Sequence, residues 1–294
     1  MIAGSSKPCK VSVIIPCYNQ GEFIDEAVES VLSQTCRDFE IIIVNDGSTD
    51  ESTNLKLRNY DKHGTRVIHT KNMGLPSARN NGIKEAKGEF ILPLDADDKI
   101  GGTYIEQALK VFETRPNTGI VYCEAVFFGA KDGAWELVEF SFERLLLENI
   151  IFCSAFFRRA DWEKAGGYRP NMVYGFEDWD FWLSLIELGR EAYKIPQKLF
   201  FYRTKDSSML GGMDKYKRSA MMLQNYLNHK ELYGEFFFER ISDALPDILC
   251  SQLFIDTGLG FKEEQSLLRH IGNKGIGRIE FDLNGFDGIR KIRF

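Results

Sequence analysis

The sequence predicts an α/β fold built on a mostly parallel sheet flanked by helices. Short apolar runs rich in Val and Ile alternate with stretches of helical periodicity over the first 128 residues. Runs that are apolar throughout indicate strands buried on both faces, as in parallel sheets. Strands that alternate with helices favour right-handed crossovers between parallel neighbours. Five runs are predicted as strands of this sheet: 11–16, 39–46, 66–70, 89–95 and 119–128.

Helices are predicted in the segments that join these strands. Apolar side chains recur at helical spacing after the first strand, and Asn19 with Glu22 has the spacing of a capping box. Ser48 with Glu51 has the same spacing before a second helix. The further helical patterns lie at 74–88 and 103–114.

The pattern changes from about residue 125. A hairpin is predicted around Lys131, Asp132 and Gly133, and an acidic start with an amphipathic pattern predicts a helix over 176–189. A strand with a short helix is predicted within 153–168, another strand at 198–205, and helical structure from about 213. The tail from 277 alternates like β-structure and stops in mid-pattern at Phe294, which favours a fragment of a longer chain.

Composition excludes several classes of protein. The 294 residues carry a net charge of -6 with 44% apolar and 27% charged residues, typical of a folded soluble chain without the basic excess of nucleic-acid binders. No apolar run is long enough to span a bilayer, and the N-terminus lacks the apolar core of a signal peptide. We therefore expect a cytoplasmic protein. The six cysteines show no CxxC pair or zinc spacing and are expected to be free thiols.

Polar side chains follow four of the predicted strands. They are Tyr18-Asn19, Asn45-Asp46, Lys71-Asn72 and Asp95 to Asp98. Ligands of open α/β sheets bind beyond the carboxyl ends of the strands. These tips should therefore converge on one edge and form a binding site.

Three aspartates in four positions, Asp95, Asp97 and Asp98, follow the strand "ILP". Carboxylate oxygens are the ligands that hard divalent cations prefer, and a cation that also bound a diphosphate would neutralise a leaving group. Taken alone, such a motif is also typical of a solvated acidic turn. The position of this motif after a buried strand favours a cation-binding site over a solvated turn.

Five other residues are candidates, each with an ordinary structural alternative. Asp46 could accept a hydrogen bond from a base or ribose, or simply form a turn before a glycine. Tyr18 could stack on a flat ring, or be half-buried. Arg79 could reach phosphates from a helix, or be solvated. Glu177 and Asp178 could include a general base, or stabilise a helix N-terminus.

Together these fragments resemble the motif series of family 2 glycosyltransferases. The matching fragments are "VSVIIPCYNQGEFIDEAVESVLSQT", "FEIIIVNDGSTDES", "NMGLPSARNNGI", "GEFILPLDADD" and "FEDWDFWLSL", in order over about 10 to 205. The resemblance implies a Rossmann-like GT-A fold and a hexosyltransferase-type enzyme of polysaccharide biosynthesis. It also implies inverting transfer from a nucleoside diphosphate sugar, with UDP favoured, assisted by Mg²⁺ or Mn²⁺.

The resemblance also implies residue roles. Asp178 would be the base that takes the acceptor proton, Glu177 would contact the acceptor, and Asp97 would hold the metal. Asp95 would contact ribose or sugar, Asp98 would support either neighbour, and Arg79 would face the nucleotide or its diphosphate. The donor-binding set is Pro16, Tyr18, Asp46, Arg79, Asp95, Asp98 and Lys205.

Lys205 marks a departure from the family pattern. Many relatives carry a His in a YRxH segment, whereas this chain has "YRTK". A protonated Lys cannot ligate a metal, but it can contact a diphosphate. The departure therefore leaves three possibilities: metal held mainly by Asp97 and water, weak dependence on metal, or a Lys205 that replaces part of the metal's charge.

We expect a glycosyltransferase domain over 1–210, with a nucleotide-binding half at 10–98, an acceptor half at 99–210, and a C-terminal extension at 211–294. The expected partners are a nucleotide-sugar donor and a glycan or lipid-linked acceptor, and no nucleic acid. Peripheral membrane association and oligomeric state stay open. Two alternatives remain: a catalytically degenerate binding or scaffold module, and a sugar-nucleotide pyrophosphorylase. The latter usually has a Gly-rich, Arg-bearing loop after the first strand, which "PCYNQGEF" lacks.

Overall fold

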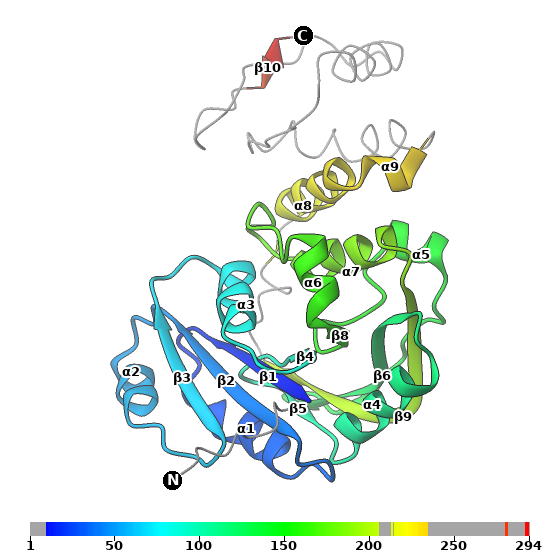
Figure 1. The fold of residues 1–294 in the computed structure, drawn as a ribbon. Helices are drawn as coiled ribbons and strands as arrows, with labels where there is room; N and C mark the ends of the chain where they lie inside the picture. The colour runs from blue at the N-terminus through cyan, green and yellow to red at the C-terminus, as the bar shows by residue number, and fades with distance from the viewer. Residues whose placement is uncertain (1–9, 206–212, 214, 235–279, 282–291, 294) are drawn as a thin grey trace, which may run out of the picture. The chain divides into compact units, whose positions relative to one another are not determined.

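The computed structural model describes residues 10–205, 213, 215–234, 280–281 and 292–293. They belong to two compact units (Figure 1). One comprises the described residues within Met1–Pro170 and Glu177–Ser208, and the other those within Asn171–Phe176 and Met209–Phe294. All candidate residues lie in the first unit.

The first four strands form a parallel sheet, as predicted. β1 lies in the middle and pairs with β2 on one side and β4 on the other, and β3 pairs with β2. Both faces of β1 are buried, because the sequence places apolar side chains on both. The bounds are β1 Val11–Cys17, β2 Phe39–Asp46, β3 Thr65–Thr70 and β4 Phe90–Pro93.

The remaining strands make the sheet mixed. The strand order is β3-β2-β1-β4-β8-β6-β9-β5, with β7 paired to β6. β8 lies antiparallel between β4 and β6, whereas β6 and β9 are parallel. The α/β fold class is confirmed, and the antiparallel strands lie after β4. The bounds are β5 Lys99–Ile100, β6 Thr118–Gly129, β7 Gly133–Trp135, β8 Phe156–Arg158 and β9 Glu191–Thr204.

Helices cover both faces of this sheet. Figure 1 shows α3 and α7 on one face and α1 and α4 on the opposite one. α3 packs on β1 and β2, and α7 packs on β6. The bounds in the first unit are α1 Ile24–Leu32, α2 Glu51–Arg58, α3 Leu75–Lys84, α4 Tyr104–Thr114, α5 Phe142–Leu147, α6 Arg159–Ala165 and α7 Glu177–Glu187. The described helices do not include one with the length and apolar character needed to cross a bilayer.

Two predicted caps are wrong. Asn19 lies outside α1, with a φ of 54°, and its Oδ1 accepts hydrogen bonds from the amides of Thr49 and Asp50. The side chain thus joins the loops after β1 and β2. The cap of α2 is Asp50, which accepts from the Thr53 amide at 2.8 Å, and Ser48 is not the cap. Sequence spacing could not predict these contacts, because the side chains of Asn19 and Ser48 form hydrogen bonds between two loops and not within a helix.

The second unit contains α8 Lys215–Asn228 and α9 Lys230–Tyr233, in agreement with the predicted helical pattern. The segment 171–176 contacts α8 through a hydrogen bond of 3.0 Å between the side chains of Asn171 and Asn228. In the tail, β10 Glu280–Phe281 and β11 Ile292–Arg293 form an antiparallel pair, as the alternation predicted. The rest of the predicted tail lies outside the described residues.

Candidate active site

The residues 95–98, called here the acidic turn, follow β4. The amide of Leu94 donates to the Ile14 carbonyl at 2.9 Å, which holds the chain against β1 up to the turn. The Asp98 amide then donates to the Asp95 carbonyl at 3.1 Å and closes the turn. The predicted strand 89–95 therefore ends early, and the three carboxylates are fixed at the carboxyl edge of the sheet.

Each carboxylate of the acidic turn has a partner from the chain. Asp95 pairs with the Arg79 guanidinium at 2.8 Å. Asp97 Oδ2 lies 2.6 Å from Lys205 Nζ. Asp98 Oδ1 accepts from the Arg203 amide at 2.7 Å. The protein itself therefore offsets the repulsion that this cluster of charges would otherwise create.

Asp98 differs from its neighbours because it is buried, with 1% of its surface exposed. Burial, followed by the charges of Asp97 and Asp95, raises the pKa of Asp98 well above its usual range. Its Oδ2 atom has no hydrogen-bond partner among the described residues. Burial therefore disfavours the charged form of this carboxyl group.

Arg79 connects the acidic turn to helix α7. Its guanidinium is buried at 1% exposure and pairs with Asp95 and with Glu177, the first residue of α7. A buried cation is stable only when it is paired, and here two carboxylates share it. Arg79 thus lies between the carboxylates of the acidic turn and those that begin α7. Its contact with the nucleotide stays a prediction. The contact of Glu177 with the acceptor also stays a prediction.

Asp178 is held by two hydrogen bonds. Its Oδ1 accepts from Asn149 Nδ2 at 3.0 Å and from the Trp179 amide at 2.8 Å. Burial and the neighbouring Glu177 carboxylate raise the pKa of Asp178 to about 7, although Arg79 and both hydrogen bonds act in the opposite direction. A carboxylate with this pKa can accept a proton near neutral pH.

The nucleoside-binding candidates lie at the ends of β1 and β2. Asp46 is 3% exposed, and its carboxylate accepts from the amide of Gly74 at 3.0 Å and the amide of Met73 at 3.2 Å. Pro16 is buried in β1, whereas Tyr18 is 44% exposed. The structure fixes Asp46 at the start of α3, and its contact with a base or ribose stays a prediction.

Four residues that sequence analysis missed contact the candidates. Asn149 donates to Asp178, and the Cys153 thiol lies 3.4 Å from Asp95 Oδ2. Gln20 Nε2 lies 3.4 Å from Asp97 Oδ2, and the Arg203 Nε donates to the Asp97 carbonyl at 2.7 Å. Only Arg203 could have been found from the sequence, because it lies in the "YRTK" segment. The other three residues lie in loops.

The acidic turn offers few protein ligands to a divalent cation. Within the described part of the chain, no group of three or more His, Cys, Asp or Glu side chains has a metal-binding arrangement. Mg²⁺ sites, however, often use one or two carboxylates and complete the shell with water and substrate phosphates. Asp97, whose side chain is 17% exposed, and the unpartnered Asp98 Oδ2 fit that kind of site.

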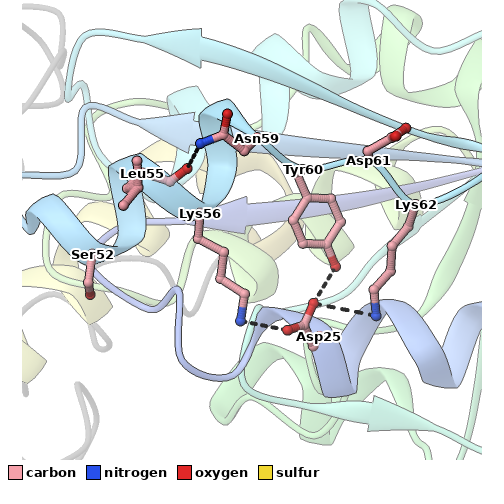
Figure 2. Close-up of a pocket in the computed structure, with 8 residues that line it drawn as sticks. All are labelled: Asp25, Ser52, Leu55, Lys56, Asn59, Tyr60, Asp61 and Lys62. Carbon is pink, nitrogen blue, oxygen red and sulfur yellow. Dashed lines mark hydrogen bonds and ion pairs between the residues drawn. The ribbon is translucent and has the colours of Figure 1, made fainter.

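A cavity of about 550 Å³ lies elsewhere, between α1 and the α2 segment (Figure 2). Asp25 lines it from α1 and binds Lys56 Nζ at 2.6 Å, Lys62 Nζ at 3.4 Å and the Tyr60 hydroxyl at 3.0 Å. Both cations are therefore already paired. None of the candidate residues lines this cavity, so we place the site at the acidic turn.

Solved structures of other proteins have a similar fold. Residues 1–349 of TarS of S. aureus, in complex with UDP-GlcNAc, superpose with a TM-score of 0.62 at 18% identity. The match covers 90% of this chain and 80% of the TarS chain of residues 1–349. This likeness supports the GT-A fold.

Sequence relatives extend the comparison. The chain is 32% identical to a hyaluronan synthase of Pasteurella multocida and 27% identical to a chondroitin synthase of strain Pm70 of that species, in both cases over 89% of this chain. It spans 27% of the length of each synthase. The sequence pattern of glycosyl transferase family 2 matches residues 12–182, which is more than half of the chain. The chain therefore belongs to glycosyl transferase family 2, as the motif series predicted.

Proposed function

We propose that the chain transfers a sugar from a nucleoside diphosphate donor, a UDP-sugar, to a hydroxyl group of a growing glycan, polysaccharide or glycolipid. Family membership supports sugar transfer in general. The synthases of hyaluronan and chondroitin support a glycan acceptor, and the TarS complex with UDP-GlcNAc supports a uridine donor. We retain the cytoplasm as the proposed location.

The observation that carries this proposal is the arrangement around Arg79. Its guanidinium pairs with Asp95 in the acidic turn and with Glu177, next to Asp178. The proposed donor contact, Asp95, thus pairs with the buried Arg79, and the proposed base, Asp178, follows the buried Glu177 in the sequence. The division into a donor half at 10–98, an acceptor half at 99–210 and an extension at 211–294 is part of the proposal.

The reaction is a single displacement. Asp178 takes the proton of the acceptor hydroxyl while the acceptor oxygen bonds to the anomeric carbon. The bond from that carbon to the diphosphate breaks, and the diphosphate leaves with the electron pair. Because attack and departure occur on opposite faces, the anomeric configuration inverts. A base with a pKa of about 7 has the strength this step needs near neutral pH.

Asp97, with Asp98 beside it, would hold Mg²⁺ or Mn²⁺. When bound, the cation stabilises the negative charge of the departing diphosphate. Pro16, Tyr18 and Asp46 are proposed to bind the nucleoside, and Asp95 the ribose or sugar. Lys205 is proposed to contact the diphosphate.

Asp178→Asn tests the proposal. A panel of nucleotide sugars is assayed with glycan acceptors by release of the nucleoside diphosphate, and UDP binding is measured by calorimetry. The variant should lose transfer and retain UDP binding within about threefold, a difference of about 0.7 kcal/mol in binding free energy. Glu187→Gln, an exposed carboxylate on the same helix, is the matched control. Unchanged turnover in Asp178→Asn would eliminate this base, and UDP binding without turnover by the wild type would favour the scaffold alternative.

A further inference from the structure

The acidic turn contains an ion pair that occupies the proposed metal ligand. Lys205 Nζ lies 2.6 Å from Asp97 Oδ2, and the side chains are 24% and 17% exposed. The ammonium group also lies 4.3 Å from the centre of the Phe23 ring, which provides a second favourable contact for a cation. The position of the ammonium is thus defined by two groups.

Arg203 and Gln20 also lie near Asp97, but neither places a positive charge against its carboxylate. Arg203 directs its Nε to the Asp97 carbonyl and pairs through Nη2 with Glu26 at 3.0 Å. Gln20 reaches Asp97 Oδ2 at 3.4 Å, but its amide is neutral. Among the described side chains, Lys205 is therefore the cation that contacts the Asp97 carboxylate.

A divalent cation and this ammonium group compete for the same oxygen. Mg²⁺ binds carboxylate oxygens at about 2.0–2.1 Å and demands near-octahedral geometry. A second positive charge at 2.6 Å from the same Oδ2 would repel it. Metal binding at Asp97 therefore requires the ion pair to open.

We propose that Lys205 is an internal counter-ion of Asp97 that competes with the divalent cation and binds the donor diphosphate in its place. This inference rests on the proposed function. A lysine is a compact charge on a flexible stem, so its ammonium group can turn from Asp97 to a diphosphate within reach. Nucleoside diphosphate binding should then persist without divalent metal.

The test uses Lys205→Met, which removes the charge and keeps most of the side-chain length. Lys62→Met is the matched control, because Lys62 is 28% exposed and pairs with Glu29 at 2.5 Å in the region of Figure 2. Mn²⁺ affinity is measured from the electron paramagnetic resonance signal of free Mn²⁺, without nucleotide. UDP affinity is measured by calorimetry in EDTA and in saturating Mn²⁺. Circular dichroism checks folding, and Lys205→Gln replaces Lys205→Met if the latter does not fold.

In Lys205→Met, Mn²⁺ should bind about tenfold tighter than in the wild type, and UDP in EDTA about tenfold weaker. This factor corresponds to a hydrogen bond with a charged partner. Lys62→Met should change neither value.

Equal Mn²⁺ affinity in Lys205→Met and wild type, or no Mn²⁺ binding by either protein, overturns the competition. Equal UDP affinity of the two in EDTA overturns the diphosphate contact. Failure of every protein to bind UDP even with Mn²⁺ overturns the diphosphate contact and also counts against the proposed function. The Mn²⁺ measurement then still decides whether Lys205 competes for Asp97.

Discussion

Replacing Asp178 by Asn should stabilise the folded chain above pH 7. Burial and Glu177 raise the pKa of Asp178 from 3.8 to about 7, so its ionisation is harder in the folded than in the unfolded chain. This difference corresponds to at most about 4 kcal/mol. Asn keeps an oxygen for the hydrogen bonds from Asn149 and the Trp179 amide, and it carries no charge.

The sign of the effect follows from proton linkage. A group whose pKa is raised on folding favours the folded state below its unfolded pKa, and this contribution is lost as the pH rises through the folded pKa. The advantage of Asp178→Asn should therefore be absent near pH 4, grow up to pH 7 and stay constant above it. The other carboxylates titrate in both proteins and largely cancel in the comparison.

Urea denaturation of wild type and variant between pH 5 and pH 8.5 measures this difference. Asp61→Asn, a substitution at an exposed carboxylate between α2 and β3, is the control. If Asp178→Asn is less stable than the wild type, or if the difference does not depend on pH, then burial of the carboxylate does not set its pKa and the reasoning fails.

Three further predictions concern the neighbours of this site and the core. Asn149→Ala removes a hydrogen bond to the Asp178 carboxylate, so the acidic limb of the kcat profile should move up by about one pH unit; an unmoved limb contradicts this. Arg79→Met leaves two carboxylates without their cation and should lower the free energy of unfolding by roughly 3–5 kcal/mol in urea; a loss below about 1 kcal/mol would show that they find other partners. Gly82→Ala places a Cβ against side chains of β1 and β2 and should cost about 1–3 kcal/mol in the same assay. Gly102→Ala, where a Cβ has room, should be nearly neutral.

The parallel half of the sheet could be predicted from the sequence because its strands are buried on both faces. The predicted strand 39–46 has the bounds of β2. β5 has two residues, too few for any periodicity. The strand predicted within 153–168 is β8, but its antiparallel pairing with β4 could not be predicted because the two strands are distant in the chain. The start of β9 was missed for a different reason: its first residues are polar and pair with β6 at a register shift.

The candidate site was found where carboxylates follow a strand or begin a helix. Its electrostatics could not be found in the same way. Burial raises the pKa of Asp98, and Asp97 pairs with Lys205, which is distant from it in the sequence. Asn149 comes from a loop after α5, whose helix was itself not predicted. Such partners depend on tertiary contacts, which a local pattern does not contain.

The insertion of β8 between β4 and β6 has a consequence for protein expression. β8 hydrogen-bonds to β4 through Phe90 with Arg158 and Ile91 with Phe157. A shortened chain that ended at 98 would keep β1 to β4 but expose one side of an apolar strand. Unpaired strand edges of this kind recruit other chains, so such a fragment should aggregate. During synthesis, β4 must likewise wait for residues 156–158 to emerge before its free edge is covered.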